Sequence, residues 1–208
     1  MDIIIDSVNK LKDLLEHSGC EDGGISLDID PNERHCQFET GEYMTASFGG
    51  RSAIFVTSNP IRANTRISYM FGAPLDTPAT RSAACAIINV ITGFFCMSRV
   101  LHACPVSAHD LCKKQLTTEI SGRRVYCAGI ISSVNAIPAV QIVSKPQDAD
   151  VILFGADGII SPDITGIITN FKSSKRIICL GPSTSGISRL EDIEHWCPFG
   201  TTQRDTAS

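Results

Sequence analysis

The stretch from Ala149 to Thr184 constrains the fold of this chain more than any other, because it has the pattern of a complete strand–helix–strand unit. Two short apolar segments, Val151–Phe154 and Arg176–Leu180, have the length and composition of buried strands. Between them, Ser161–Lys172 starts with serine and proline, which suit the N-cap and the first position of a helix. A helix that joins two successive strands places them parallel in one sheet. The stretch therefore predicts a parallel sheet.

The residues around this unit continue the same alternation. Arg124–Ala128 and Ala139–Val143 are further strand-like segments. Helical patterns cover Ala79–Leu101, Val106–Leu116 and Ser188–Trp196. Short apolar strands that alternate with helices are typical of a parallel sheet with both faces covered. We therefore predict an α/β fold with a Rossmann-like, mainly parallel sheet and helices on both faces.

The first part of the chain has a different pattern, which predicts a small α+β domain. Ser7–His17 places its apolar residues on one face of a helix. Three strand-like segments, Ile25–Ile29, one within Cys36–Phe48, and Ala53–Thr57, indicate a small antiparallel or mixed sheet. Ser58–Pro78 contains three prolines and predicts an irregular connection. The predicted boundaries are residues 1–78 for this domain, 79–200 for the Rossmann-like domain and 201–208 for a disordered tail.

Composition and charge argue against a nucleic-acid partner and against a membrane span. The formal net charge is −4, and only 19% of the residues are charged, so no basic stripe is available to neutralise phosphates. Cysteines are nine in number, which is odd, and Met1–Asp6 is acidic rather than a signal peptide. We therefore expect reduced cysteines and a cytoplasmic location. The uncharged run Ser82–Ser98 is shorter than the roughly 20 apolar residues of a membrane span, which favours a buried core helix.

The loops at the carboxyl ends of the strands form the predicted ligand-binding edge. In an open parallel sheet these loops line the binding crevice, and helix N-termini there offer free N–H groups to a ligand. The residues predicted at this edge are Gly129, Asn135, Gly155, Asp157, Gly158, Gly181, Pro182, Ser183 and Thr184. The Asp157 carboxylate and the hydroxyls of Ser183 and Thr184 suit a polar ligand. The alternative is that the glycines only permit tight strand-to-helix turns.

A second cluster contains sulfur and imidazole groups. Its members are Cys96, His102, Cys104, His109 and Cys112. His109 and Cys112 are spaced to share one face of a helix, and these side chains are ligands that zinc or a related metal ion prefers. One interpretation is therefore a metal site. The alternative is core packing, because the spacing matches no zinc module and buried free cysteine commonly serves as a small apolar residue.

Catalytic residues are not evident in the sequence. Cys36 directly follows His35, but neighbours on a strand point to opposite faces, so the imidazole of His35 is not directed at the sulfur. No other nucleophile and base are paired by a motif. The sequence therefore does not indicate a reaction.

Four segments resemble one known family. They are SAACAIINVI, GRRVYCAG, ADVILFGADGI and LGPST, in this order between Ala79 and Ser188. They look like segments of the archaeal and bacterial family described as a heavy-metal-chelation domain of unknown function. The resemblance implies a Rossmann-like C-terminal half and a first half similar to the amino-terminal domain of enolases. The chain departs from the family between Ile130 and Ala149, where too few residues remain for a crossover helix and a strand.

These observations give three functional hypotheses. The first is a cytoplasmic protein that binds a metal ion, expected to be divalent, or a small polar metabolite at the carboxyl edge of the sheet. The second is an enzyme that uses a nucleotide-type cofactor such as S-adenosylmethionine on the same edge. The sequence lacks the GxGxxG and GxxxxGK[ST] phosphate-binding motifs, although an enzyme whose cofactor has no pyrophosphate does not need them. The third is a structural subunit with Val151–Phe154 or the C-terminal helix as its interface. We also expect a homo-oligomer.

Overall fold

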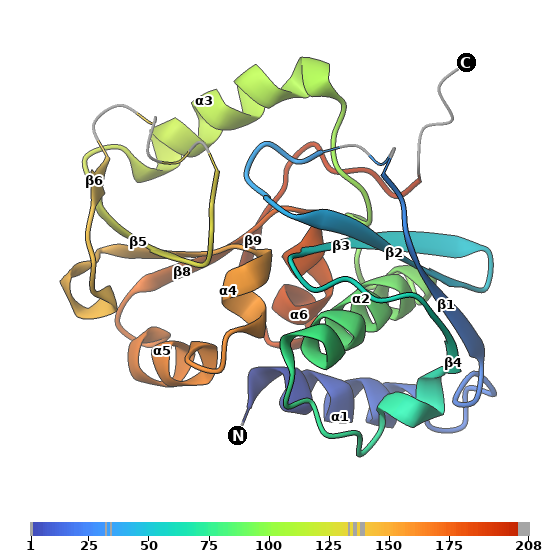
Figure 1. Cartoon of the computed structure of the whole chain (residues 1–208). Coiled ribbons are helices and arrows are strands. Elements are labelled where there is room, and N and C mark those ends of the chain that lie inside the picture. Colours follow the sequence, from blue (N-terminus) through green and yellow to red (C-terminus); the bar gives the residue numbers. More distant parts are fainter. Residues whose placement is uncertain are drawn as a thin grey trace.

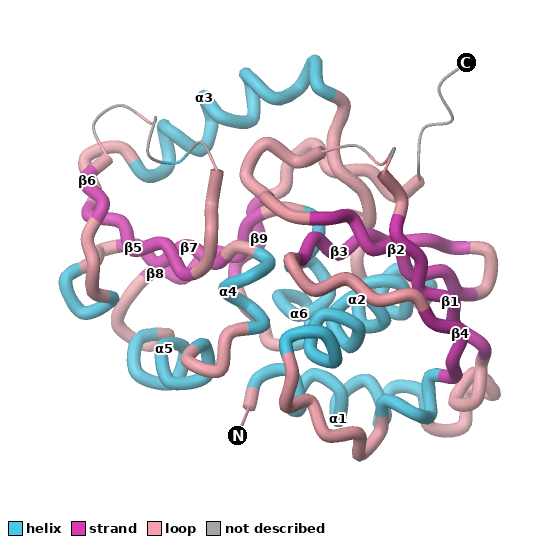
Figure 2. Tube along the Cα trace, in the orientation of Figure 1, coloured by secondary structure: helices cyan, strands magenta, loops and turns pink. Residues whose placement is uncertain are grey.

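The computed structural model describes residues 2–31, 33, 35–132, 134, 137 and 140–203. Within them the chain forms an antiparallel sheet from its first half and a parallel sheet from its second half, side by side (Figure 1). Tracing the chain by secondary structure shows helices on both faces of the parallel sheet, with α3 on one face and α4 and α5 on the other (Figure 2). The predicted fold class is therefore confirmed.

The antiparallel sheet has four strands. They are β1 (Gly24–Ile29), β2 (Glu42–Phe48), β3 (Arg51–Thr57) and β4 (Ala63–Arg66), in the order β3-β2-β1-β4. Gly49 and Gly50 join β2 to β3 with φ values of 55° and 77°, the left-handed pair that a tight two-residue hairpin turn needs.

The predicted irregular connection at Ser58–Pro78 is wrong, because β4 and the 3₁₀ helix η1 (Ile67–Met70) lie within it. β4 has the sequence Ala-Asn-Thr-Arg and is half-exposed. It pairs only with β1, at the edge of the sheet. An edge strand with so few apolar residues gives no hydrophobic periodicity that the sequence could reveal.

One helix, α2, packs on this sheet, and α1 packs on α2. α1 (Ile3–Leu15) begins earlier than the predicted Ser7, because the Asp2 carboxylate accepts the N–H groups of Ile4 and Ile5 and caps the helix. α2 (Pro78–Phe94) begins after Thr77, whose side chain and that of Thr80 form a reciprocal capping pair. The helix contacts β2 and β3 along its length.

α2 ends at Phe94 and not near Leu101 as predicted. The chain leaves the helix through Cys96, which has a left-handed φ of 58°. The carbonyl of Thr92 then accepts the N–H groups of both Met97 and Ser98, at 2.8 and 3.2 Å. The residue in the left-handed conformation is a cysteine, and the nearby glycine, Gly93, lies inside the helix, so the sequence does not mark the stop at this position.

The parallel sheet has five strands. They are β5 (Arg124–Ala128), β6 (Gln141–Ile142), β7 (Val151–Phe154), β8 (Arg176–Leu180) and β9 (Glu194–Trp196), in the order β6-β5-β7-β8-β9. Every pairing in it is parallel. β7 is buried at every position, so in this structure the segment proposed as an oligomer interface is a central strand of the core.

Helices of the second half differ from the prediction in their bounds. They are α3 (His109–Ile120), which follows the 3₁₀ helix η2 (Val106–Ala108), then α4 (Ala156–Ile160), α5 (Ile164–Phe171) and α6 (Ser185–Leu190). The helix predicted at Ser161–Lys172 therefore begins three residues later than predicted, at Ile164. Ser161 is the C-cap of α4 and does not cap α5. Short 3₁₀ helices, η4 (Pro146–Asp148) and η5 (Pro182–Thr184), complete the connections.

The predicted closing helix Ser188–Trp196 is wrong in its second half. Asp192 has a left-handed φ of 50° and ends the helical stretch. The next residues pair with β8 as β9, with Cys179 opposite His195. The amphipathic pattern of this segment is real, but pairing with a neighbouring strand overrides helix propensity.

Helices α1 and α2 contact elements of both halves of the chain. α2 packs on β2 and β3 and also contacts α4 and α6. α1, near the start of the sequence, packs against α6, near its end, where Ser7 Oγ donates to Glu191 Oε1 at 2.7 Å. The domain boundary at residue 78 thus falls beside a helix that contacts both halves, and the boundary stays a prediction.

The predicted tail begins with residues that the structure places. Thr201 forms an antiparallel bridge with His102, and Thr202 Oγ1 donates to Arg99 O at 3.0 Å. Residues 204–208 lie outside the described residues. In the part of the chain that the structure describes, no helix is long and apolar enough to cross a membrane.

Candidate functional site at Glu39

The loop between β1 and β2 reaches across to the parallel sheet. Glu39 N–H donates to Cys36 O at 3.1 Å and closes a turn. Phe38 O accepts the N–H of Ser132, in the loop after β5, at 3.1 Å. The hydroxyls of Thr40 and Ser132 share a hydrogen bond. A loop of the first sheet therefore covers the carboxyl edge of the second, where open parallel sheets bind their ligands.

Glu39 is the side chain that this loop inserts at the edge. It is 7% exposed, and its Oε1 accepts the N–H of Ser183 at 3.0 Å. Gly181 makes this approach possible, because its φ is 80° and a Cβ there would lie 2.5 Å from Glu39 Oε1. Glu39 Oε2 is buried and has no hydrogen-bond partner among the described residues. An unpaired buried oxygen costs free energy unless a ligand or water satisfies it.

Electrostatics place the titration of this carboxyl close to neutral pH. Burial raises the pKa of Glu39 from 4.5 to about 7, the hydrogen bonds from Ser183 oppose this, and the negative charge of Asp157 adds to it. Burial also raises the pKa of Asp157, in the first turn of α4. Glu39 thus exchanges its proton near pH 7, and a cation or hydrogen-bond donor that reached Oε2 would favour the charged form.

Four cysteine thiols, which we call the thiol cluster, interact electrostatically with one another, and two of them also interact with Glu39. Cys36 and Cys197 interact with the carboxyl, and Cys104 interacts with both of these and with Cys112. Cys36, Cys112 and Cys197 are free thiols. Burial raises the pKa of Cys36, Cys112 and Cys197, and the Glu39 charge raises those of Cys36 and Cys197 further. A neighbouring cation would have the opposite effect on the thiols.

The polar residues predicted after β8 are at this edge, but their hydroxyls bond within the protein. Ser183 Oγ accepts the N–H of Val56 at 2.9 Å, and Thr184 Oγ1 donates to two carbonyl oxygens of the preceding turn, both at 3.1 Å. Ser183 and Thr184 are fully buried, and so is Pro182 in η5. Ser183 therefore directs its hydrogen bonds to Glu39 and Val56 rather than to a ligand.

The predicted glycines after β5 and β7 are brought together by the fold. A Cβ on Gly129, whose φ is 87°, would collide with Gly158 N, and a Cβ on Gly158 would collide with Ala128 O. Gly155 N–H donates to the same carbonyl at 3.1 Å. These contacts are those of a tight backbone crossing, as the alternative interpretation of the glycines requires. Asn135 lies outside the described residues.

The predicted sulfur and imidazole cluster is divided between three places. Cys96 is exposed beyond the end of α2. His102 is 2% exposed, with Nε2 3.0 Å from Ser52 O and Nδ1 3.7 Å from Glu33 Oε2. Cys104 and Cys112 belong to the thiol cluster described above.

His109 is the remaining member of that predicted cluster, and it begins α3. Its carbonyl oxygen accepts a hydrogen bond from Gln37 Nε2 at 2.6 Å, while its Nε2 is buried without a partner among the described residues. Across that part of the chain, no group of three or more His, Cys, Asp or Glu side chains is arranged to hold a metal ion. The cluster is thus not a formed metal centre in this structure.

Sequence reasoning missed Glu39 and Cys197. Glu39 is 144 residues from Ser183 in the sequence, and it lies in a loop with no motif. Cys197 follows a strand that the sequence pattern presents as a helix. The one sequence signal that pointed to this site was Gly181. Its missing side chain leaves room for the side chain of another residue, which the sequence does not identify.

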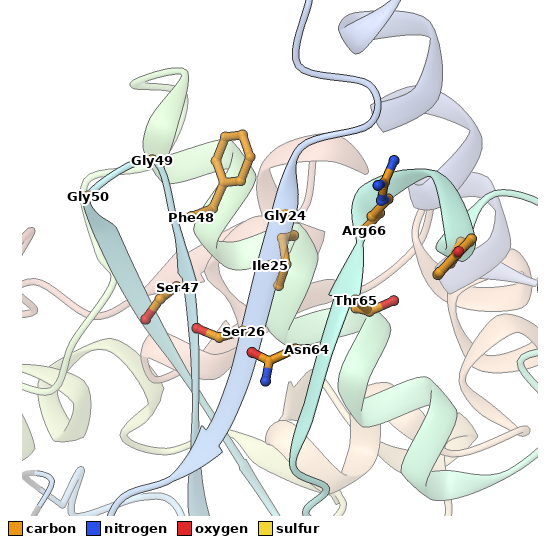
Figure 3. A pocket seen from close by; sticks show the side chains of 11 residues that line it. Gly24, Ile25, Ser26, Ser47, Phe48, Gly49, Gly50, Asn64, Thr65 and Arg66 are labelled. Atoms are coloured by element: carbon orange, nitrogen blue, oxygen red, sulfur yellow. The ribbon is translucent and has the colours of Figure 1, made fainter.

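A separate hollow lies over the outer face of the antiparallel sheet, away from this edge (Figure 3). It has a volume of about 630 Å³. Short polar side chains line it, among them Ser26, Ser47 and Asn64, and Ser26 stands opposite the other two in the strand register. Polar residues on one face are usual for an antiparallel sheet that meets water on that side.

The fold and the site together define an α/β protein in which a loop of an antiparallel sheet closes the ligand edge of a parallel sheet. No family model matches the chain, and no curated protein matches it by sequence. Among solved structures, the chain is similar to a protein of unknown function from the DUF364 family of Pyrococcus horikoshii, with 14% identity and a TM-score of 0.47, over 87% of this chain and 79% of that one. It is similar to another DUF364 protein of unknown function, from Desulfitobacterium hafniense, with 11% identity and a TM-score of 0.47, over 79% of this chain and 76% of that one.

Proposed function

We propose that this protein binds a small polar ligand at the carboxyl edge of the parallel sheet, and that Glu39 is its anchor. One observation carries the proposal: Glu39 Oε1 is held by Ser183 while Oε2 is buried and unpaired among the described residues. A carboxyl kept in this state destabilises the fold at neutral pH. Such a cost is typical of residues that serve binding or catalysis.

The charge at the site favours a ligand with a positively charged or hydrogen-bond-donating group. Glu39 and Asp157 are both acidic, and the negative charge of Asp157 raises the pKa of Glu39. No arginine, lysine or histidine forms an ion pair with Glu39 in the described part of the chain. An amine, an amide N–H or a cation that approached Oε2 would satisfy the oxygen and lower the pKa of the carboxyl.

A thiophilic divalent metal ion is a second candidate, and the thiol cluster is the observation that favours it. Cys36 and Cys197 interact with Glu39, and thiolate with carboxylate oxygen is a ligand set for zinc and related ions. The thiols would have to move together and lose protons, because no metal-holding group is formed in the described residues. Binding would therefore release protons and weaken as the pH falls.

The close crossing of the loops after β5 and β7 weighs against the nucleotide-cofactor hypothesis. Gly129 and Gly158 meet backbone to backbone, where a Rossmann-type cofactor would need the loops to part.

The homo-oligomer stays a prediction.

Binding can be tested by thermal unfolding at pH 8 with Zn²⁺, Cd²⁺ and a panel of small amines as probes. A probe present at 100 times its dissociation constant should stabilise the protein by about 2.7 kcal/mol. Glu39→Gln keeps an acceptor for the Ser183 N–H but removes the charge, and we expect it to lose the stabilisation. Glu42→Gln, the same change on an exposed residue, is the matched control.

The metal candidate has its own comparison. Cys36→Ser with Cys197→Ser should abolish stabilisation by Zn²⁺ or Cd²⁺ and leave that by an amine intact. If neither metal ions nor amines stabilise the protein, and no small molecule is released from freshly purified protein on denaturation, the proposal is wrong. Equal stabilisation of the Glu39→Gln variant would also exclude Glu39 as the anchor.

A further inference from the structure

A second hollow lies beside α6, and neither Glu39 nor Ser183, which holds it, is among the residues that line this hollow. Its volume is about 280 Å³. Residues 97–100, which follow α2, form one wall, and α6 with the turn into β9 forms the other. This volume is just below the range of roughly 300 to 1,000 Å³ that is usual for ligand pockets. The hollow thus suits a small molecule or the head group of a larger one.

Two exposed arginines line this pocket. Arg99 comes from the connection after α2 and Arg189 from the last turn of α6. Both are exposed, and neither forms an ion pair in the part of the chain that is described. Elsewhere on the surface, Arg124 and Arg176 pair with carboxylates at 2.8 and 2.6 Å. The pocket arginines therefore keep their donors for another acceptor.

A buried hydroxyl provides an independent indication of a ligand. Ser185 lines the pocket, is 2% exposed, and its Oγ has no hydrogen-bond partner among the described residues. Its carbonyl oxygen is already used, because it accepts from Ser188 Oγ at 2.9 Å. A buried hydroxyl left unpaired in this way costs free energy unless a bound group satisfies it.

The remaining charges of the pocket leave it positive. Asp192 lines the pocket and carries one negative charge against the two arginines, which leaves a net charge of one positive unit. His195 adds no charge at neutral pH, because burial lowers its pKa and the hydrogen bond to Gly181 O only partly opposes this. Its Nε2 lies 2.8 Å from that carbonyl oxygen, so Nε2 carries the proton and Nδ1 is the free acceptor of the ring.

We propose that this pocket binds the phosphate group of a small phosphorylated molecule. Arg99 and Arg189 donate charge-assisted hydrogen bonds to the phosphate oxygens, and the Ser185 hydroxyl donates a third bond from the buried wall. Asp192 accepts from a hydroxyl of the rest of the molecule. This site differs from the one proposed at Glu39, since other residues line it and it takes an anionic rather than a cationic group.

The test is binding of inorganic phosphate and glycerol phosphate to the whole chain, measured by calorimetry at constant ionic strength with chloride as the balancing anion. We expect saturable binding, and a decrease in affinity of about tenfold or more for Arg189→Ala, since a hydrogen bond to a charged group contributes about 1.5 to 3 kcal/mol. Arg99→Ala and Ser185→Ala should also weaken binding. Arg123→Ala, at an exposed arginine with no ion pair in the described residues, should not.

Three results would overturn this assignment. They are the absence of saturable phosphate binding, an Arg99→Ala/Arg189→Ala double variant that binds as well as the wild type, and a loss for Arg123→Ala as large as that for Arg189→Ala. Acetate is the comparison for the class of anion, and saturable binding of acetate with none of phosphate would replace the phosphate by a carboxylate. Circular dichroism confirms folding, and Arg189 is exposed enough that its loss leaves the core intact.

Discussion

Glu39 Oε1 accepts the backbone N–H of Ser183 at 3.0 Å, and this bond joins the loop of one sheet to the carboxyl edge of the other. The carboxyl belongs to neither sheet, yet it is almost completely buried between them. Its protonation therefore couples the stability of the whole chain to pH.

Stability should fall between about pH 4.5 and pH 7 because of Glu39. Its pKa is about 7 in the folded chain and 4.5 in its ordinary state, so the unfolded chain loses the proton first as the pH rises. The stabilisation that comes from this more tightly held proton is fully present below about pH 4.5, and it is lost as the pH rises through about 7. The pKa difference corresponds to about 3 kcal/mol.

Glu39→Gln should remove this dependence and stabilise the protein at pH 8 more than at pH 5. Urea unfolding at the two pH values measures the free energies, with Glu42→Gln as the control for a surface carboxyl. If Glu39→Gln changes the free energy of unfolding equally at both pH values, the buried carboxyl does not have the raised pKa.

Gly181→Ala should destabilise the protein by more than backbone strain alone. Its φ of 80° is shared by Gly72, where a Cβ would meet nothing within 4 Å. At Gly181 the Cβ would meet Glu39. We expect about 1 kcal/mol for Gly72→Ala and about 2 to 4 kcal/mol for Gly181→Ala, measured by urea unfolding. Equal effects would show that the Glu39 side chain moves aside without cost.

Asn89→Ala should be among the more damaging substitutions in the chain. Asn89 is fully buried in α2, and its amide donates to Ile54 O and Ser183 O while accepting from Gly186 N–H, at 3.0, 2.9 and 2.8 Å. Removing it leaves three buried backbone groups unpaired, which we expect to cost about 3 to 5 kcal/mol. Asn64→Ala, on the exposed sheet face, is the control and should change the free energy of unfolding by less than about 0.5 kcal/mol.

Cys96 should be the fastest cysteine to react with a thiol reagent in the folded protein. It is exposed, whereas Cys36, Cys104 and Cys112 are buried. Cys96→Ser should remove the fast phase of labelling, and denaturation should expose all nine thiols. Rapid labelling of Cys36 in the folded state would contradict this, because it would mean that the loop bearing Glu39 opens readily.

The sequence predicted the elements whose patterns are local. Val151–Phe154 and Arg176–Leu180 are strands with the predicted bounds, because a buried strand needs only a short apolar run between breakers. β4 and β9 were not predicted, since their pairing partners decide their structure and their own residues are polar or amphipathic. Tertiary contacts determine whether such a segment forms a strand, and the local propensity of its residues does not reveal those contacts.

The candidate site was predicted only in its location. The carboxyl edge follows from the topology of a parallel sheet, and Gly181 was correctly placed on it. Glu39 was not foreseeable, because its role arises from a contact with Ser183 across 144 positions and from burial that raises its pKa. Neither the residue type nor its neighbours in sequence carry that information.

The packing of α1 against α6 has a consequence for how the chain is made. A helix near the beginning of the sequence is completed by Glu191 and Leu190 near its end, through Ser7 and Lys10. During synthesis α1 therefore emerges before both of its packing partners, α2 and α6, and its contact with α6 is the later of the two to become available. Contacts between such distant positions also slow folding, so the side of α1 that meets α6 stays open to chaperones until the residues of α6 have been made.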